Sequence, residues 1–251
     1  MVVESQSIGG RRGSLFGGAG LAAGVAALEE SADRPVVWAT GQYVSTVALG
    51  SEMAIEVAFP AMGHSMAQGR ALGTVDGREI ISVVGALGTR REEVAGVWAE
   101  APAVRPPDEC ELLERSFDVP CVHDHVDVRL ASGMFGFSGQ GEPSGDGHLM
   151  LWVRMPEVAL DAPALALIAD YMSAGVGNAI GTMVHCTSLD NTIRYANPLL
   201  PEDAGRWVLC DAEVAFAGNG LAYGSGHIWS ESGRLLATAS QSMTVGLLSN
   251  T

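Results

Sequence analysis

The sequence predicts an α+β fold built from two copies of one plan, in each of which a helix packs against an antiparallel sheet. Two hairpins carry this prediction: residues 69–87 and residues 224–242 each hold two alternating strands around an Asp-Gly or Ser-Gly turn. Glycine supplies the positive φ that such turns require. Ala86 and Gln241 occupy matching positions, so the copies lie 155 residues apart (241 − 86). A period this long indicates two domains rather than a solenoid, although a single large sandwich with accidental similarity stays open.

Each copy is expected to begin with a helix and to continue with two strands before its hairpin. The first helix should cover residues 15–30, with Ser14 as its cap. In the second copy Asp161 is the expected N-cap, and Pro163 falls in the first turn of a helix that runs to roughly residue 175. The strands expected before the hairpins cover residues 36–44, 53–59, 187–195 and 207–215.

Proline and acidic residues mark the boundary between the copies. Residues 99–120 hold four prolines and a run of acids, which is the composition of a linker. We therefore expect an N-terminal domain over residues 10–98 and a C-terminal domain over residues 121–251. A further strand pair in the C-terminal domain, residues 125–132 and 148–155, should flank a glycine-rich loop.

Charge and composition exclude several classes of function. The 251 residues include 14 basic and 29 acidic side chains, a net charge of −15, and every basic residue is an arginine. A chain without lysine cannot be a phosphate-loop NTPase or a pyridoxal enzyme, because each needs a lysine at its reaction centre. The acidic balance disfavours nucleic acid and an anionic membrane as partners. We expect neither a cofactor nor a metal.

The cysteines and the N-terminus bear on location. Four cysteines are widely spaced without a C-x-x-C pair, so neither a disulfide framework nor a zinc cage is expected, and reduced thiols indicate the cytoplasm. Arg11-Arg12 before the uncharged residues 13–28 resembles a twin-arginine export signal. That run is short and rich in Gly and Ala, so a helix is the preferred interpretation, with export as the alternative.

Two local motifs suggest chemistry that their surroundings do not support. The segment around Ser65 is one residue short of a nucleophile elbow, because position 67 is alanine, and a strand rather than a helix should follow. His123 and His125 alternate on an expected strand without a third ligand at a metal-binding spacing. We interpret both histidines as solvated edge residues.

Two polar residues of the second copy have no counterpart in the first. Asp190 lies in an expected strand whose matching segment around Trp38 has no acid, and Gln241 stands in an apolar strand where the first copy has Ala86. Burying a polar side chain costs free energy unless it is paired. The difference predicts a site at Asp190 and Gln241; otherwise Asp190 caps a turn and Gln241 faces solvent.

A series of short motifs runs in a specific order through nearly the whole chain, from about residue 13 to residue 245. The motifs are Leu15-Phe16-Gly17-Gly18 at a helix start, Ser188-Leu189-Asp190 followed by Asn197-Pro198, Trp207 before a strand, and the segment from Gly233 to Gln241. In this order they resemble the acyl-CoA thioesterase II family. The resemblance implies two tandem hotdog domains, each a helix wrapped by an antiparallel sheet. It also implies hydrolysis of fatty acyl-CoA without a covalent intermediate, by an Asp, a Ser or Thr, and a Gln that hold water.

The resemblance assigns roles to residues of this sequence. Asp190 matches the family's Asp and Gln241 its Gln. The hydroxyl residue should fall close to residues 214–216, where no Ser or Thr stands, and Asn219 and Thr192 are the candidates to replace it. Backbone N–H groups of Gly17 and Gly18 at the helix N-terminus should bind the negative charge that develops on the substrate.

These observations together predict a cytoplasmic acyl-CoA thioesterase of fatty acid metabolism, which releases free acid and CoA. A non-catalytic acyl-CoA-binding protein is the alternative, because the hydroxyl is missing from its expected position. A serine esterase using Ser65 and a hotdog hydratase are weaker; hydratases pair an acid with a histidine, and Asn191 follows Asp190 here. Exposed strand edges lead us to expect a homodimer.

Overall fold

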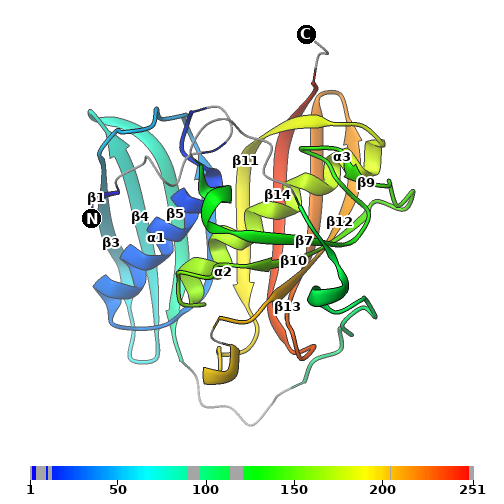
Figure 1. The fold of residues 1–251 in the computed structure, drawn as a ribbon. Helices are drawn as coiled ribbons and strands as arrows, with labels where there is room; N and C mark the ends of the chain where they lie inside the picture. The colour runs from blue at the N-terminus through cyan, green and yellow to red at the C-terminus, as the bar shows by residue number, and fades with distance from the viewer. Residues whose placement is uncertain are drawn as a thin grey trace.

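A computed structural model of the protein describes residues 2–3, 10, 13–89, 96–113, 121–203 and 205–248. Its described part forms one long antiparallel sheet with two helical segments packed against it (Figure 1). Twelve described strands follow the order β1-β3-β4-β5-β2-β11-β14-β13-β12-β10-β7-β6. The α+β class predicted from the sequence is confirmed.

The first half consists of α1 and four long strands. Its elements are α1 (Gly17–Ala32), β2 (Val36–Tyr43), β3 (Met53–Met62), β4 (Met66–Val75) and β5 (Arg78–Gly88). The turn between β4 and β5 is Asp76-Gly77, with φ of 50° and 75°, as the sequence predicts. The predicted cap is wrong: Phe16 is the N-cap of α1, whereas Ser14 is held extended by a β-bridge to Ala48.

The second half repeats this plan and adds strands. Its elements are β7 (Asp127–Ser132), β10 (His148–Arg154), α2 (Ala162–Ala169), α3 (Gly175–Ile180), β11 (Val184–Tyr195), β12 (Val208–Gly218), β13 (Leu221–Ser230) and β14 (Leu235–Leu247). The predicted cap of α2 is confirmed, because Asp161 Oδ1 accepts a hydrogen bond from Ala164 N at 2.8 Å. Four two-residue strands complete the described set: β1 (Val2–Val3), β6 (Glu111–Leu112), β8 (Met134–Phe135) and β9 (Gln140–Gly141).

The strand order confirms the internal duplication. The order β3-β4-β5-β2 of the first half is repeated as β12-β13-β14-β11 in the second. The two halves meet where β2 pairs with β11, with Thr40 opposite Thr192 and Gly41 opposite Asn191. A single sheet therefore runs unbroken across both copies, which is how each copy avoids an open edge at this seam.

The helices pack side by side on one face of the sheet. In Figure 1 α1 lies over β4 and β5, and α2 lies next to it, while β7 and β10 pass on the near side of α2 and α3. The sheet thus curls around the helical segment of the second half. Leu21 and Leu28 of α1 join Leu165 and Ile168 of α2 in one core, all 1% exposed or less.

Part of the expected linker packs against the second half. Trp152 Nε1 of β10 donates to the Arg105 carbonyl at 2.9 Å, and Cys110 is buried with Trp152, Leu209 and Trp229. Residues 114–120 lie outside the described residues, as do Arg11 and Arg12. Among the helices that the structure describes, none has both the length and the apolar character needed to cross a bilayer.

Candidate active site

Three polar side chains from three separate elements meet beside α1. Asp170 directly follows α2, Ser188 lies in β11, and Gln241 lies in β14. Ser188 Oγ donates to Asp170 Oδ1 at 3.3 Å, and Gln241 Nε2 donates to Ser188 Oγ at 2.7 Å and also to Asp170 Oδ1. Asp170 is 3% exposed and Gln241 1%, whereas Ser188 is half-buried and forms the exposed side of this Asp170–Ser188–Gln241 cluster.

The helical segment of the second half carries Asp170 into the cluster. Every residue of α2 from Ala164 to Ala169 is buried, so the helix is enclosed by protein on all sides. The chain then tightens into a 3₁₀ turn, Asp170–Ala174, before α3 begins. The sequence analysis missed Asp170. An isolated acid inside an apolar run is the signal that points to it, because burying a carboxylate without partners is costly.

The N-terminus of α1 supplies another hydrogen bond to the same carboxylate. Gly18 N donates to Asp170 Oδ2 at 2.8 Å, and the positive end of the helix dipole faces this oxygen. A β-carbon at residue 18 would lie 2.5 Å from the Leu167 carbonyl oxygen, so glycine is what allows α1 to approach α2 this closely. Gly17 also borders Asp170, since a β-carbon there would lie 3.0 Å from Oδ2. The charge that Gly18 binds in this structure is that of Asp170; binding of substrate by Gly17 and Gly18 stays a prediction.

Burial and hydrogen bonding act on the Asp170 carboxyl in opposite directions. Burial raises its pKa above the ordinary value, and hydrogen bonds from Gly18, Gln241 and Ser188, with a contribution from Asn191, lower it in part. A carboxylate that is held ionised but whose pKa is raised is a better proton acceptor than an exposed aspartate. The cluster therefore has the electrostatic character of a general base with two orienting groups.

A β-bulge in β11 separates Ser188 from Asp190. The register of β11 against β14 shifts between these two residues, so the simple alternation that would put both on one face does not hold. Ser188 turns toward Asp170, while Asp190 Oδ1 accepts a hydrogen bond from Ser242 N at 2.7 Å. Asp190 therefore does not join Gln241, and Asp170 stands where the sequence analysis expected Asp190.

The outer face of the sheet holds Asp190 and Thr192. Asp190 lines a shallow bowl with Thr40 and Gln42, and the Thr192 hydroxyl hydrogen-bonds to that of Thr40 at 2.9 Å. Gly41, between Thr40 and Gln42, faces the helices, because a β-carbon there would lie 3.1 Å from a methyl carbon of Leu21. Thr192 thus faces away from the cluster.

Asn219 also lies apart from the Asp170–Ser188–Gln241 cluster. It occupies the exposed turn between β12 and β13, with φ of 53°. Its turn position explains the residue type, because asparagine tolerates the left-handed conformation better than most residues. A hydroxyl does lie in the cluster, that of Ser188, two residues before Asp190 in the sequence. Period-2 alternation could not single out Ser188, because the bulge is set by tertiary pairing.

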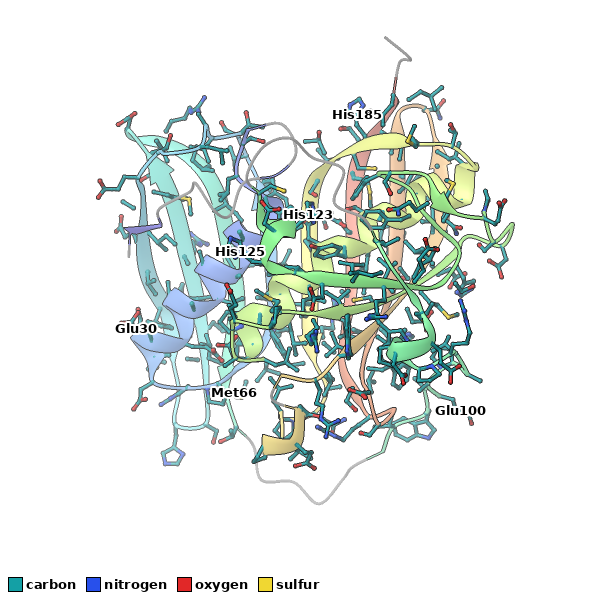
Figure 2. The ribbon with its side chains drawn as sticks, in the orientation of Figure 1. Glu30, Met66, Glu100, His123, His125 and His185 are labelled. Atoms are coloured by element: carbon teal, nitrogen blue, oxygen red, sulfur yellow. The ribbon has the colours of Figure 1, made fainter. Side chains whose placement is uncertain are left out.

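The two local motifs of the sequence, the histidine pair His123 and His125 and the segment around Ser65, both have structural explanations. His123 lies in a 3₁₀ turn, Val122–His125, rather than in a strand; its Nδ1 is 2.7 Å from the Tyr171 hydroxyl, beside the N-terminal end of α1 (Figure 2). The prediction of a solvated edge is therefore wrong for His123, because the turn directs it inward. Ser65 is exposed in the loop before β4 and is followed by a strand. In the described part of the chain, no group of three His, Cys, Asp or Glu side chains is placed to hold a metal ion.

Comparison with known proteins gives the family. A family model, acyl-CoA thioesterase C-terminal domain, matches residues 99–245, which include Asp170, Ser188 and Gln241. A search of curated protein sequences finds no match. A solved structure of a candidate thioesterase from Novosphingobium aromaticivorans is 33% identical, aligns over 99% of this chain and 94% of its own, and has a TM-score of 0.84.

Two further solved structures share the fold at lower identity. A hot dog fold protein from Alicyclobacillus acidocaldarius is 21% identical over 99% of this chain and 92% of its own, with a TM-score of 0.85. An acyl-CoA thioesterase II from Mycobacterium marinum is 20% identical over 94% of this chain and 91% of its own, with a TM-score of 0.72. The family model covers more than half of the chain, and the relative from Novosphingobium is 33% identical over nearly all of it. Together with the duplicated helix-and-sheet plan, these matches show that this chain is a tandem-hotdog member of the acyl-CoA thioesterase II family.

Proposed function

We propose that the protein hydrolyses acyl-CoA to free acid and CoA by direct attack of water held at Asp170, Ser188 and Gln241. The observation that carries this proposal is the convergence of a buried carboxylate from the turn after α2, a hydroxyl from β11 and an amide from β14. These are the three residue types with which the family is expected to hold water. Membership of a thioesterase family supports thioester hydrolysis; the acyl-CoA substrate is our inference.

The proposed reaction needs no covalent intermediate. Asp170 accepts a proton as the water oxygen forms a bond to the thioester carbonyl carbon, and Ser188 and Gln241 orient that water. The tetrahedral intermediate collapses with cleavage of the carbon–sulfur bond, and the proton on Asp170 passes to the departing CoA thiolate. Asp170 is then ionised again for the next turnover.

The surroundings of Ser188 suit an apolar acyl group. Met243 stands opposite Ser188 in the β11–β14 pairing and is buried in one apolar cluster with Val184, against which Cys186 and Val245 are partly buried. Burial raises the pKa of the Cys186 thiol to about 12, and the Asp170 charge contributes. Cys186 is therefore protonated at neutral pH and is not an alternative nucleophile, because the thiolate is the reactive form.

The first test compares wild type with Asp170→Asn and Asp190→Asn, measuring free CoA released from short-, medium- and long-chain acyl-CoA. We expect Asp170→Asn to lower kcat by about 10²–10⁴-fold, the range for loss of a general base. Asp190→Asn, which removes an acid from the outer face of the same strand region, is the matched control and should retain hydrolysis. Full activity of Asp170→Asn with loss in Asp190→Asn would overturn the assignment in favour of Asp190.

The alternatives give different outcomes in the same assay. Saturable acyl-CoA binding without CoA release by wild type would leave the non-catalytic binding protein. Its original support was the missing hydroxyl near residue 215, and Ser188 supplies a hydroxyl elsewhere. Release that persists in Asp170→Asn but disappears in Ser65→Ala would indicate a serine esterase.

Location and assembly belong to the same proposal. Cys110 and Cys210 are buried free thiols, which suits a reducing compartment such as the cytoplasm. The two-residue outer strands β1 and β6 leave sheet edges where a second copy could add. Cell fractionation and analytical ultracentrifugation test the cytoplasmic location and the homodimer respectively.

A further inference from the structure

Asn191 is a fully buried amide on the helix-facing side of the sheet, next to the cluster. It stands opposite Gln241 across the β11–β14 pairing and opposite Gly41 across the β2–β11 seam. Its side chain is 0% exposed, and neither its Oδ1 nor its Nδ2 has a hydrogen-bond partner among the described residues. The Tyr43 hydroxyl and Gln241 Oε1 are also buried without a partner in that part of the chain.

Unpaired polar atoms gathered at one buried place call for an explanation. Most buried polar groups in folded proteins have partners, and leaving one without a partner carries a free-energy penalty. Here four such atoms, on Tyr43, Asn191 and Gln241, surround one carboxylate. The Asn191 amide lies near enough to lower the pKa of both the Asp170 carboxyl and the Tyr43 phenol without a hydrogen bond to either, because the positive end of the amide dipole favours the ionised form of each.

We propose that Asn191 is a positioning residue of the site: its buried side-chain amide, opposite Gln241 at the seam between the two halves, holds the Asp170 carboxylate ionised and oriented toward the water that it activates. This inference rests on the proposed function. On this proposal β11 contributes two groups to the site, the hydroxyl of Ser188 before the bulge and the amide of Asn191 after it.

The other groups that face Asp170 do not titrate near neutral pH. They come from several elements: Gly18 N–H of α1, Ser188 and Cys186 of β11, Gln241 of β14, Tyr171 of the 3₁₀ turn and Tyr43 of β2. His123 of the Val122–His125 turn contacts the Tyr171 hydroxyl rather than Asp170 itself. Burial raises the pKa of both tyrosines well above 10 and that of Cys186 to about 12. Asp190 acts on Tyr43 through its charge, from the outer face. The acidic limb of a pH–rate profile therefore reports the ionisation of Asp170.

The test removes the amide while keeping the branched shape of the side chain. Asn191→Leu is compared with wild type and with Thr40→Val, a matched control that removes a polar group from the seam on the opposite face of the sheet. In protein carrying ¹³C-labelled aspartate, the carboxyl signal of Asp170, assigned with Asp170→Asn, is titrated by NMR. We expect the Asp170 pKa to be higher in Asn191→Leu than in wild type and unchanged in Thr40→Val.

Kinetics supply a second readout that a structural role would not move. In Asn191→Leu the acidic limb of kcat should shift to higher pH, with kcat lowered about tenfold at the acid end. KM should stay as in wild type, because the amide does not bind the acyl-CoA itself. Asn191→Asp, nearly identical in shape, places a second carboxylate beside Asp170 and should raise the Asp170 pKa further, because two adjacent carboxylates resist joint ionisation. It also serves as the test if the leucine variant fails to fold.

The outcomes separate the two proposals. An Asp170 pKa that is the same in wild type and in both Asn191 variants overturns the role of Asn191 while leaving thioester hydrolysis untouched. A wild type that releases no CoA from any acyl-CoA overturns the proposed function, and the NMR titration still decides whether Asn191 controls the ionisation of Asp170.

Discussion

At the scale of the residue, the Asp170 carboxylate is held in a place that disfavours its charge. Burial is the largest influence on its pKa, and the hydrogen bonds from Gly18, Gln241 and Ser188 offset it in part. A group that must be ionised to work but is destabilised by its surroundings costs the fold some stability. This conflict between stability and activity can be measured directly.

We expect Asp170→Asn to raise the melting temperature at neutral pH even though it slows hydrolysis. The pKa of Asp170 is higher in the folded protein than in the unfolded chain, so the folded state binds the proton more readily. Its ionisation therefore weakens the fold above the folded-state pKa; the penalty shrinks as the pH falls below that value and is gone below the pKa of the unfolded chain. Thermal unfolding followed by circular dichroism should give a difference between variant and wild type that shrinks toward acidic pH. A variant less stable than wild type at neutral pH would contradict this account.

At the scale of the element, the close approach of α1 to α2 brings a backbone donor of the first half to the Asp170 carboxylate. Gly18 lies at the point of closest approach, where a β-carbon would meet the Leu167 carbonyl oxygen at 2.5 Å. At Gly20, two residues nearer the middle of α1, the nearest atom would be a methyl carbon of Ile81 at 3.2 Å. The backbone oxygen cannot move aside as a side-chain methyl can.

Gly18→Ala and Gly20→Ala should therefore have unequal effects. We expect Gly18→Ala to destabilise the protein by about 1–3 kcal/mol, the usual range for overpacking, and to lower kcat by displacing the N–H donor to Asp170. Gly20→Ala is the matched control: it gains up to about 1 kcal/mol of helix propensity and should keep activity. Urea unfolding and CoA release measure the two quantities, and equal losses in both variants would show that the contact with Leu167 does not control the site.

At the scale of the whole molecule, the site belongs to neither half alone. Asp170, Ser188, Asn191 and Gln241 come from the second half, while the Gly18 N–H and Tyr43 come from the first. The halves share the β2–β11 pairing and a continuous core in which α1 packs on α2. Separation would expose the edge of β11 and remove a donor from Asp170.

Residues 99–251 produced without residues 1–98 should therefore lose hydrolysis by at least about a hundredfold, the usual cost of a misplaced catalytic group. Co-expression of both segments as separate chains should restore activity, because the seam is non-covalent sheet pairing. Activity of the second half alone equal to that of the full chain would refute a site shared between the halves.

The sequence by itself determined the duplication, the hairpins, the cap at Asp161 and the family. These features depend on local chemistry: glycine at positive φ, alternation along a strand and a side-chain cap next to its helix. Gln241 was also found from sequence, because a polar residue in an apolar strand stands out.

Asp170 and Ser188 were missed for two physical reasons. Asp170 accepts a hydrogen bond from Gly18 of α1 in the first half, a contact between residues 152 apart in the chain that local pattern cannot show. Ser188 and Asp190 face opposite sides because β11 bulges against β14. Side-chain direction beyond a bulge depends on how the strand pairs with its neighbour, so only the tertiary structure could decide which acid meets the glutamine.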